Sequence, residues 1–218
     1  MRRPSLKNDT AKTQRPIFII ISGPSGVGKD AVISRLKETG IPLQQIVTMT
    51  TRPRRPTEKD KVDYQFVSKE QFIQLKKENE LLESATVYGN YYGVPKKDVV
   101  ENLKAGRDVM VKVDVQGAET IKQVMPQAVA IFISPPTKEE LFTRLKNRST
   151  ESENEMRVRL QAAEEEFQKL PAFDYVVINY QNEIDRTVAA ISAIINVEKG
   201  SDIPKRPALE NQLKQKGQ

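Results

Sequence analysis

Short apolar runs alternate along the chain with stretches in which apolar residues recur every three or four positions. The near-continuous apolar run at 17–21 predicts a strand buried on both faces of a parallel sheet. The apolar runs at 108–113, 128–133 and 175–178 predict three more strands, of which 128–133 is also expected to be buried. Helical spacing predicts helices over 28–39, 96–105, about 118–124, from 137 with a long continuation to 170, and 183–197. This alternation indicates an α/β fold, with helices on both faces of a parallel sheet.

The interval 46–95 departs from this pattern. It contains strand candidates at 46–50, around 64–67 and at 81–87, and a polar amphipathic helix at 69–80. The tyrosine- and glycine-rich segment 88–95 predicts a turn. Several short strands in succession do not fit the repeating unit of the rest of the chain. We therefore expect this interval to form an insertion at the mouth of the main sheet.

Composition excludes several kinds of chemistry. The 218 residues include no cysteine and no histidine, which excludes thiolate nucleophiles, serine triads and most zinc sites. No apolar run approaches the roughly 20 residues that span a membrane. The beginning of the chain does not resemble a signal peptide. We therefore expect one domain in the cytoplasm, without a membrane partner, whose chemistry relies on carboxylates, lysine, arginine and backbone amides.

The net charge of +6 lies in the ends of the chain. Residues 1–16 carry +4 and residues 199–218 carry +3, which leaves the body close to neutral. Both ends are polar and predict solvated, disordered tails. A basic charge placed this way is poor evidence for a nucleic-acid-binding face, and we expect no nucleic-acid partner.

Residues 17–30, IFIIISGPSGVGKD, carry the strongest motif. An apolar strand, a glycine-rich loop and the start of a helix match G-x-x-x-x-G-K-[ST] through Gly23, Gly28 and Lys29. In such a loop the backbone amides surround a phosphate and the lysine reaches the outer phosphates. A simple glycine-rich turn is the alternative, but the strand before and the helix after favour a nucleotide site. Asp30 replaces the expected hydroxyl residue and offers Mg²⁺ a carboxylate instead.

Two further segments carry arginines that suit phosphate. Arg52, Arg54 and Arg55 lie among prolines, with a tyrosine shortly after. Arginine forks bind phosphate in a bidentate manner, so this segment is either a second phosphate site or a solvated loop. The segment 144–160 is dense in Arg and Glu, and is either an exposed helix with i,i+4 ion pairs or a lid that delivers arginines to a phosphoryl group.

Together these motifs resemble the guanylate kinases, which are nucleoside monophosphate kinases with a P-loop core. The resemblance covers about residues 16–197 and rests on GPSGVGK, TTRPRRPTEKDKVDYQFVS, LLESATVYGNYYGVP, DVQGA and RLKNRSTESENEMRVRL in that order. It implies a domain at 16–198, between tails at 1–15 and 199–218. Within it the resemblance implies a core (16–46, 96–136 and 170–198), a small β-rich GMP-binding insertion (47–95) and a helical lid (about 137–169).

The resemblance also implies transfer of a phosphoryl group from ATP to GMP or dGMP with Mg²⁺, by a monomer or homodimer. The loop residues Gly23, Pro24, Ser25, Gly26, Val27, Gly28, Lys29 and Asp30, together with Asn179, would bind ATP. Arg52, Arg55, Tyr64 and Tyr92 would hold the GMP phosphate, Glu83 would accept hydrogen bonds from guanine, and Thr48, Val94 and Asp114 occupy other GMP-contacting positions. Lys29, Arg52, Arg144, Arg148 and Arg159 would stabilise the transferring group, and Asp30 would bind the metal.

Three positions depart from the family pattern. Asp30 and Val94 replace hydroxyl residues, and Lys112 replaces an acid. Loss of the hydroxyl at Val94 removes one hydrogen bond to guanine, worth about 0.5–1.5 kcal/mol. We hypothesise that Lys112 partly neutralises Asp30. The residues leave three functions open: an active guanylate kinase, a binding or regulatory module of the same fold with little catalysis, and a kinase for another phosphorylated substrate.

Overall fold

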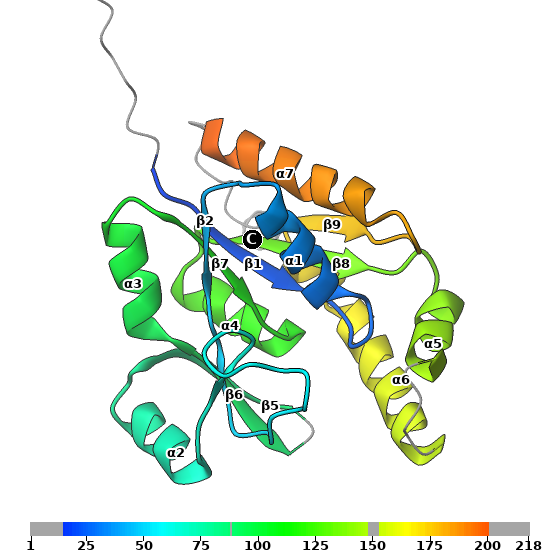
Figure 1. The fold of residues 1–218 in the computed structure, drawn as a ribbon, viewed down its shortest axis with the longest axis horizontal. Helices are drawn as coiled ribbons and strands as arrows, with labels where there is room; N and C mark the ends of the chain where they lie inside the picture. Colours follow the sequence, from blue (N-terminus) through cyan, green and yellow to red (C-terminus); the bar gives the residue numbers. More distant parts are fainter. Residues whose placement is uncertain (1–14, 88, 148–152, 201–218) are drawn as a thin grey trace, which may run out of the picture.

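The computed structural model describes residues 15–87, 89–147 and 153–200, and for 147 and 153–160 it describes the backbone only. The main sheet has five parallel strands in the order β2-β7-β1-β8-β9 (Figure 1). Its strands are β1 (Phe18–Ser22), β2 (Leu43–Ile46), β7 (Asp108–Lys112), β8 (Val129–Ser134) and β9 (Tyr175–Ile178). Their carboxyl ends share one edge, where ligands bind in open α/β sheets.

Each face of the main sheet is covered by helices. Ile19 and Ile21 of β1 pack with α1 (Lys29–Glu38) and α7 (Ile184–Gly200). The alternate residues, Phe18 and Ile20, point to the opposite face and pack with α3 (Lys96–Lys104) and α4 (Val115–Val124). Because successive strand residues face opposite sides, a strand buried on both faces must be apolar throughout. This explains the unbroken apolar run that predicted β1.

A second sheet lies apart from the first (Figure 1). Its four strands have the order β4-β3-β6-β5 and comprise β3 (Met49–Thr50), β4 (Gln65–Phe66), β5 (Leu81–Val87) and β6 (Asn90–Pro95). Helix α2 (Lys69–Lys77) packs on it, and its Phe72 stacks on Tyr91 with ring centroids 5.3 Å apart. The predicted fold class, a parallel sheet with helices on both faces and a small β-rich insertion, is therefore confirmed.

Three helical segments complete the described chain. Helices α5 (Lys138–Asn147) and α6 (Glu153–Gln168) extend to one side of the main sheet, and a short 3₁₀ turn (Leu170–Ala172) leads into β9 (Figure 1). No helix within the described ranges is long and apolar enough to cross a membrane. Of the tails predicted at 1–15 and 199–218, residues 1–14 and 201–218 lie outside the described residues, whereas Lys199 and Gly200 belong to the end of α7.

Three element predictions were wrong. Segment 88–95 is not a turn throughout, since Asn90–Pro95 forms β6 and pairs antiparallel with β5. The single strand expected at 46–50 is two strands, β2 in the main sheet and β3 in the small one. Helix α4 begins at Val115 rather than near Ala118, because the Asp114 side chain caps it and accepts a hydrogen bond from the Gly117 amide at 2.8 Å.

Candidate active site

The glycine-rich loop after β1 is shaped by close backbone packing. Gly23 has φ of 138°, and a Cβ atom there would lie 2.2 Å from the carbonyl oxygen of Ile133 in β8. Only glycine fits both this dihedral angle and this approach. Lys29 folds back over the loop and donates to the carbonyl oxygens of Gly23 at 2.5 Å and Pro24 at 3.0 Å. The predicted nucleotide loop therefore has the expected conformation, with its lysine over the loop.

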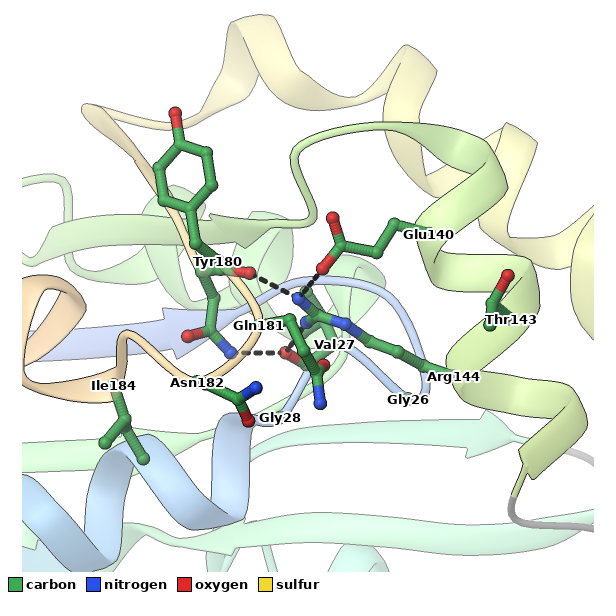
Figure 2. A pocket seen from close by; sticks show the side chains of 11 residues that line it. Gly26, Val27, Gly28, Glu140, Thr143, Arg144, Tyr180, Gln181, Asn182 and Ile184 are labelled. Carbon is green, nitrogen blue, oxygen red and sulfur yellow. Dashed lines mark hydrogen bonds and ion pairs between the residues drawn. The ribbon is translucent and has the colours of Figure 1, made fainter.

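Two side chains from distant elements hold the far end of this loop. Asn179, which follows β9, is buried and donates to the Val27 carbonyl oxygen at 2.7 Å. Arg144 of α5 donates to the Val27 carbonyl at 3.2 Å and to the Asn179 carbonyl at 2.7 Å. Arg144 also forms an ion pair with Glu140 (Figure 2). In this structure Arg144 thus contacts the loop itself.

A pocket of about 630 Å³ opens beside these contacts (Figure 2). Its lining includes Gly26, Val27 and Gly28 of the loop, Glu140, Thr143 and Arg144 of α5, and the segment 179–182 with Ile184. This volume lies within the usual range for small-molecule sites, roughly 300–1,000 Å³. The position of Asn179 was predicted to be on the adenine side of the site, and the structure places it at this pocket.

The other predicted lid arginines cannot be placed. Arg148 lies outside the described residues. Arg159 lies in α6, in the part of that helix for which only the backbone is described. Their predicted role in stabilising the transferring group stays a prediction.

The predicted phosphate clamp gathers on the small sheet. Tyr64 and Tyr92 meet edge to face at 6.0 Å, and the Arg52 guanidinium lies 5.5 Å from the centre of the Tyr64 ring. Arg52 is held by Glu58, whose carboxylate accepts a hydrogen bond from Arg52 Nη2 at 2.7 Å. Arg55 donates its backbone amide to the same carboxylate at 2.8 Å, while its side chain is 61% exposed. Arg52 is thus fixed in place, and Arg55 faces solvent.

Glu83 lies buried on the small sheet, facing helix α4. Its carboxylate approaches Gly117 so closely that a Cβ atom there would lie 2.7 Å from Glu83 Oε1. Val94 pairs directly with Glu83 across β5 and β6 and is fully buried. Thr48 is also buried, and Asp114 lies next to Gly117 as the cap of α4. The structure therefore groups Glu83 and Asp114, and Val94 packs beside Glu83 in the core.

Burial controls the protonation of these acids. Desolvation, reinforced by the charge of Asp114, raises the pKa of Glu83 to about 8. Burial also raises the pKa of Asp114, against the opposing effects of the Gly117 amide and Lys29. An acid with its pKa near 8 is mostly protonated at neutral pH. Glu83 must therefore lose its proton before both of its carboxylate oxygens can accept hydrogen bonds from the same ligand.

Asp30 and Lys112 form a direct ion pair. Lys112 Nζ lies 2.5 Å from Asp30 Oδ1, although the two residues are 82 positions apart. Lys112 ends β7 beside Ile21 of β1, so its side chain emerges next to the glycine-rich loop. The Lys112 side chain is 11% exposed and that of Asp30 is 75% exposed. The ion pair supports the hypothesis that Lys112 partly neutralises Asp30, and its effect on activity stays a prediction.

Asp30 also has the chemistry to bind Mg²⁺. Its exposed carboxylate follows Lys29 directly at the start of α1, and carboxylate oxygen is a ligand that Mg²⁺ prefers. Within the described ranges, no group of three or more acidic residues is placed to bind a metal. Asp30 would therefore supply one ligand, and phosphates and water would supply the others, as is usual for Mg²⁺.

Three residues near the site carried no recognisable sequence signal. Glu58 holds Arg52, and Gly117 makes room for Glu83. Glu166 of α6 has its pKa raised to about 7 by burial, against the opposing charge of Lys29. Glu166 lies in a run of three glutamates that reads as a solvated helix face. Its proximity to the loop appears only when α6 is placed in three dimensions.

Comparison with known proteins identifies relatives over nearly the whole described chain. A family model described as guanylate kinase matches residues 14–198. The chain is 43% identical over 185 residues to guanylate kinase from Oceanobacillus iheyensis, which covers 85% of this chain and 89% of the relative. It is 42% identical over 190 residues to guanylate kinase 2, chloroplastic/mitochondrial, from Oryza sativa subsp. japonica, covering 87% of this chain and 67% of the relative.

A solved structure agrees with these sequence matches. The crystal structure of guanylate kinase from Anaplasma phagocytophilum superimposes with a TM-score of 0.73 and 33% sequence identity, covering 92% of this chain and 96% of that one. Fold and sequence therefore lead to the same family.

Proposed function

The chain belongs to the guanylate kinase family, and from this premise we propose that it transfers the γ-phosphoryl group of ATP to the phosphate of GMP. The products are ADP and GDP. An oxygen of the GMP phosphate forms a bond to the γ-phosphorus, and the bond from that phosphorus to the β,γ-bridging oxygen of ATP breaks. The attacking oxygen is already ionised, so the reaction needs no general base and a chain without histidine can perform it.

In this proposal the loop after β1 binds the ATP phosphates. Its backbone amides and Lys29 supply positive charge, and Arg144 and Asn179 keep the loop in shape through Val27. The adjoining pocket accommodates the adenosine. Mg²⁺, when bound, would supply positive charge that offsets the negative charge of the phosphates. Asp30 would contribute one ligand to it, next to Lys29.

The small sheet would bind GMP. Arg52, Tyr64 and Tyr92 contact its phosphate, and Glu83 accepts from the ring N–H and the exocyclic amine of guanine. Adenine does not offer this pair of donors. The observation that carries the assignment is the burial of the Glu83 carboxyl group on the small sheet. Burying such a group costs free energy, and hydrogen bonds from a bound base would offset that cost.

We also propose the division expected from the sequence, with a core, a GMP-binding insertion at 47–95 and a lid at about 137–169. Closure of such a lid would exclude water, which otherwise competes with GMP for the phosphoryl group. We propose a cytoplasmic location for this nucleotide-metabolic role. The name of the rice relative, chloroplastic/mitochondrial, makes an organelle the alternative.

A coupled assay for ADP release tests the function. Purified protein with Mg-ATP is offered GMP, dGMP, AMP, UMP or CMP in turn, and we expect turnover with GMP and dGMP above the others. Measurable GMP binding without turnover of any substrate would favour the binding or regulatory module. Turnover of another monophosphate but not GMP would instead favour a changed base preference, in which case the packing around Val94 is the place to look.

A further inference from the structure

Lys112 occupies the space between the two parts of the proposed active site. Its backbone belongs to β7, next to the strand that leads into the ATP-binding loop. Its ammonium group contacts Asp30 of α1 on one side. On the other side it lies 4.3 Å from the centre of the Tyr64 ring, which belongs to the proposed phosphate clamp. The Lys112 ammonium group therefore contacts both the proposed ATP-binding loop, through Asp30, and the proposed phosphate clamp, through Tyr64.

The ammonium group lies in a mostly buried place, since the Lys112 side chain is only 11% exposed. Arg52 approaches the same Tyr64 ring at 5.5 Å. A phosphate that reaches the Tyr64 hydroxyl therefore enters a region bordered by two cations.

The present partner of Lys112 is easily exchanged. The Asp30 side chain is 75% exposed, so water can solvate its carboxylate when Lys112 leaves it. A nucleotide phosphate carries up to two negative charges, whereas a carboxylate carries one. The backbone of Lys112 is held in β7, so the proposed exchange of Asp30 for phosphate requires only rotation of the Lys112 side chain.

We propose that Lys112 is a further binding residue for the acceptor nucleotide, whose ammonium group leaves Asp30 and contacts the phosphate on the side that faces the ATP-binding loop. This inference rests on the proposed function. It assigns a role to the departure from the family pattern at position 112, where an acid is usual. Without GMP, Lys112 compensates the charge that Asp30 adds. With GMP bound, it would bring positive charge between the two reacting phosphates.

Calorimetric titration without ATP or Mg²⁺ tests this contact directly. We expect Lys112→Met to weaken GMP binding about tenfold or more, as for loss of a charged hydrogen bond. Binding of guanosine, which lacks the phosphate, should stay the same. The matched control is Lys199→Met, which removes an ion pair of 2.6 Å with Asp108 at the opposite end of the same strand. That variant should bind GMP as the unaltered protein does.

A second variant distinguishes a direct contact between Lys112 and phosphate from a purely structural role of the ion pair between Lys112 and Asp30. Asp30→Asn removes the same ion pair but leaves the ammonium group, so it should bind GMP at least as tightly as the unaltered protein. Equal weakening of GMP binding by Asp30→Asn and Lys112→Met would mean that the pair only fixes the structure, and would overturn the proposal. So would GMP binding by Lys112→Met within twofold of the unaltered protein.

Failure of the proposed function gives a different pattern. If the unaltered protein neither binds nor phosphorylates GMP, the assigned function is wrong. If it does both, and Lys112→Met binds GMP normally, the function stands and only the role of Lys112 is lost. Lys112→Arg adds a check on chemistry, since a retained positive charge should restore part of the GMP affinity.

Discussion

The loop after β1, which is proposed to bind ATP (the donor loop), and the small sheet, which is proposed to bind GMP (the acceptor sheet), are built by different means. Around the loop the defining contacts are made by the backbone: Gly23 lies against the Ile133 carbonyl, and the Val27 carbonyl accepts from Asn179 and Arg144. On the acceptor sheet the defining groups are charged side chains, with Glu58 on Arg52 and a buried Glu83. Backbone packing fixes a shape, whereas buried charges tune a response to pH and ligand. Substitutions in the two regions should therefore have different effects on activity and stability.

A substitution that makes a side chain collide with the backbone at the donor loop should have the largest effect on activity. Gly23→Ala would force a Cβ atom to 2.2 Å from the Ile133 carbonyl oxygen, so the loop amides and Lys29 must move. We expect kcat/KM to fall about 1,000-fold, since misplaced phosphate donors lose most of their effect. Steady-state kinetics with Mg-ATP and GMP measure this.

Gly40→Ala is the matched control for that variant. Gly40 also has a positive φ, of 76°, but nothing lies within 4 Å of its Cβ position. It should share the backbone strain, about 1 kcal/mol of unfolding free energy, and leave kcat/KM within twofold. If both variants lose activity equally, strain rather than collision explains the requirement for glycine.

Substitution of Glu83 on the acceptor sheet should lower activity while it raises stability. In Glu83→Gln the amide presents one acceptor and one donor to guanine, so we expect kcat/KM for GMP to fall about 100-fold. The same change removes a buried carboxyl group that faces Asp114. Thermal unfolding at pH 8 should therefore show a variant more stable by about 1–3 kcal/mol.

The pH dependence of stability follows from the same group. Folding raises the pKa of Glu83 from 4.5 to about 8, so the folded state keeps a proton that the unfolded state loses in this window. The contribution of Glu83 to stability is therefore present below pH 4.5 and is lost as the pH rises through 8. The stability gain of Glu83→Gln should grow over that range. A gain that is equal at pH 5 and pH 8 would contradict the raised pKa.

The smallest effect should come from the residue that positions the clamp. Glu58→Gln keeps the shape of the side chain but removes the charge that holds Arg52. We expect the KM for GMP to rise about threefold to fivefold with little change in kcat, because substrate binding weakens more than chemistry. Glu38→Gln breaks the 2.8 Å pair with Arg35 away from the site and should leave the KM unchanged.

Sequence patterns predicted the main sheet well because its strands are buried on both faces. Such strands must be apolar at every position, as in β1 and β8, and this leaves a plain signal. The small sheet was harder to predict. Its β6 combines tyrosines and a glycine, and it is a strand only because β5 and β3 pair with it. Local composition there resembled a turn, and tertiary pairing overrode it.

By itself, the sequence determined the donor loop, since a buried strand, Gly23, Gly28 and Lys29 all lie within residues 17–30. The order of strand, glycines and lysine is local information, whereas the contacts that hold the loop, to Ile133, Asn179 and Arg144, come from the tertiary structure. The surroundings of Glu83 and the contact between Lys112 and Asp30 were decided by the tertiary structure. Glu83 depends on the room left by Gly117, and Lys112 meets Asp30 across 82 positions. Contacts between distant residues depend on how strands are ordered and helices packed, and single-residue patterns do not record this.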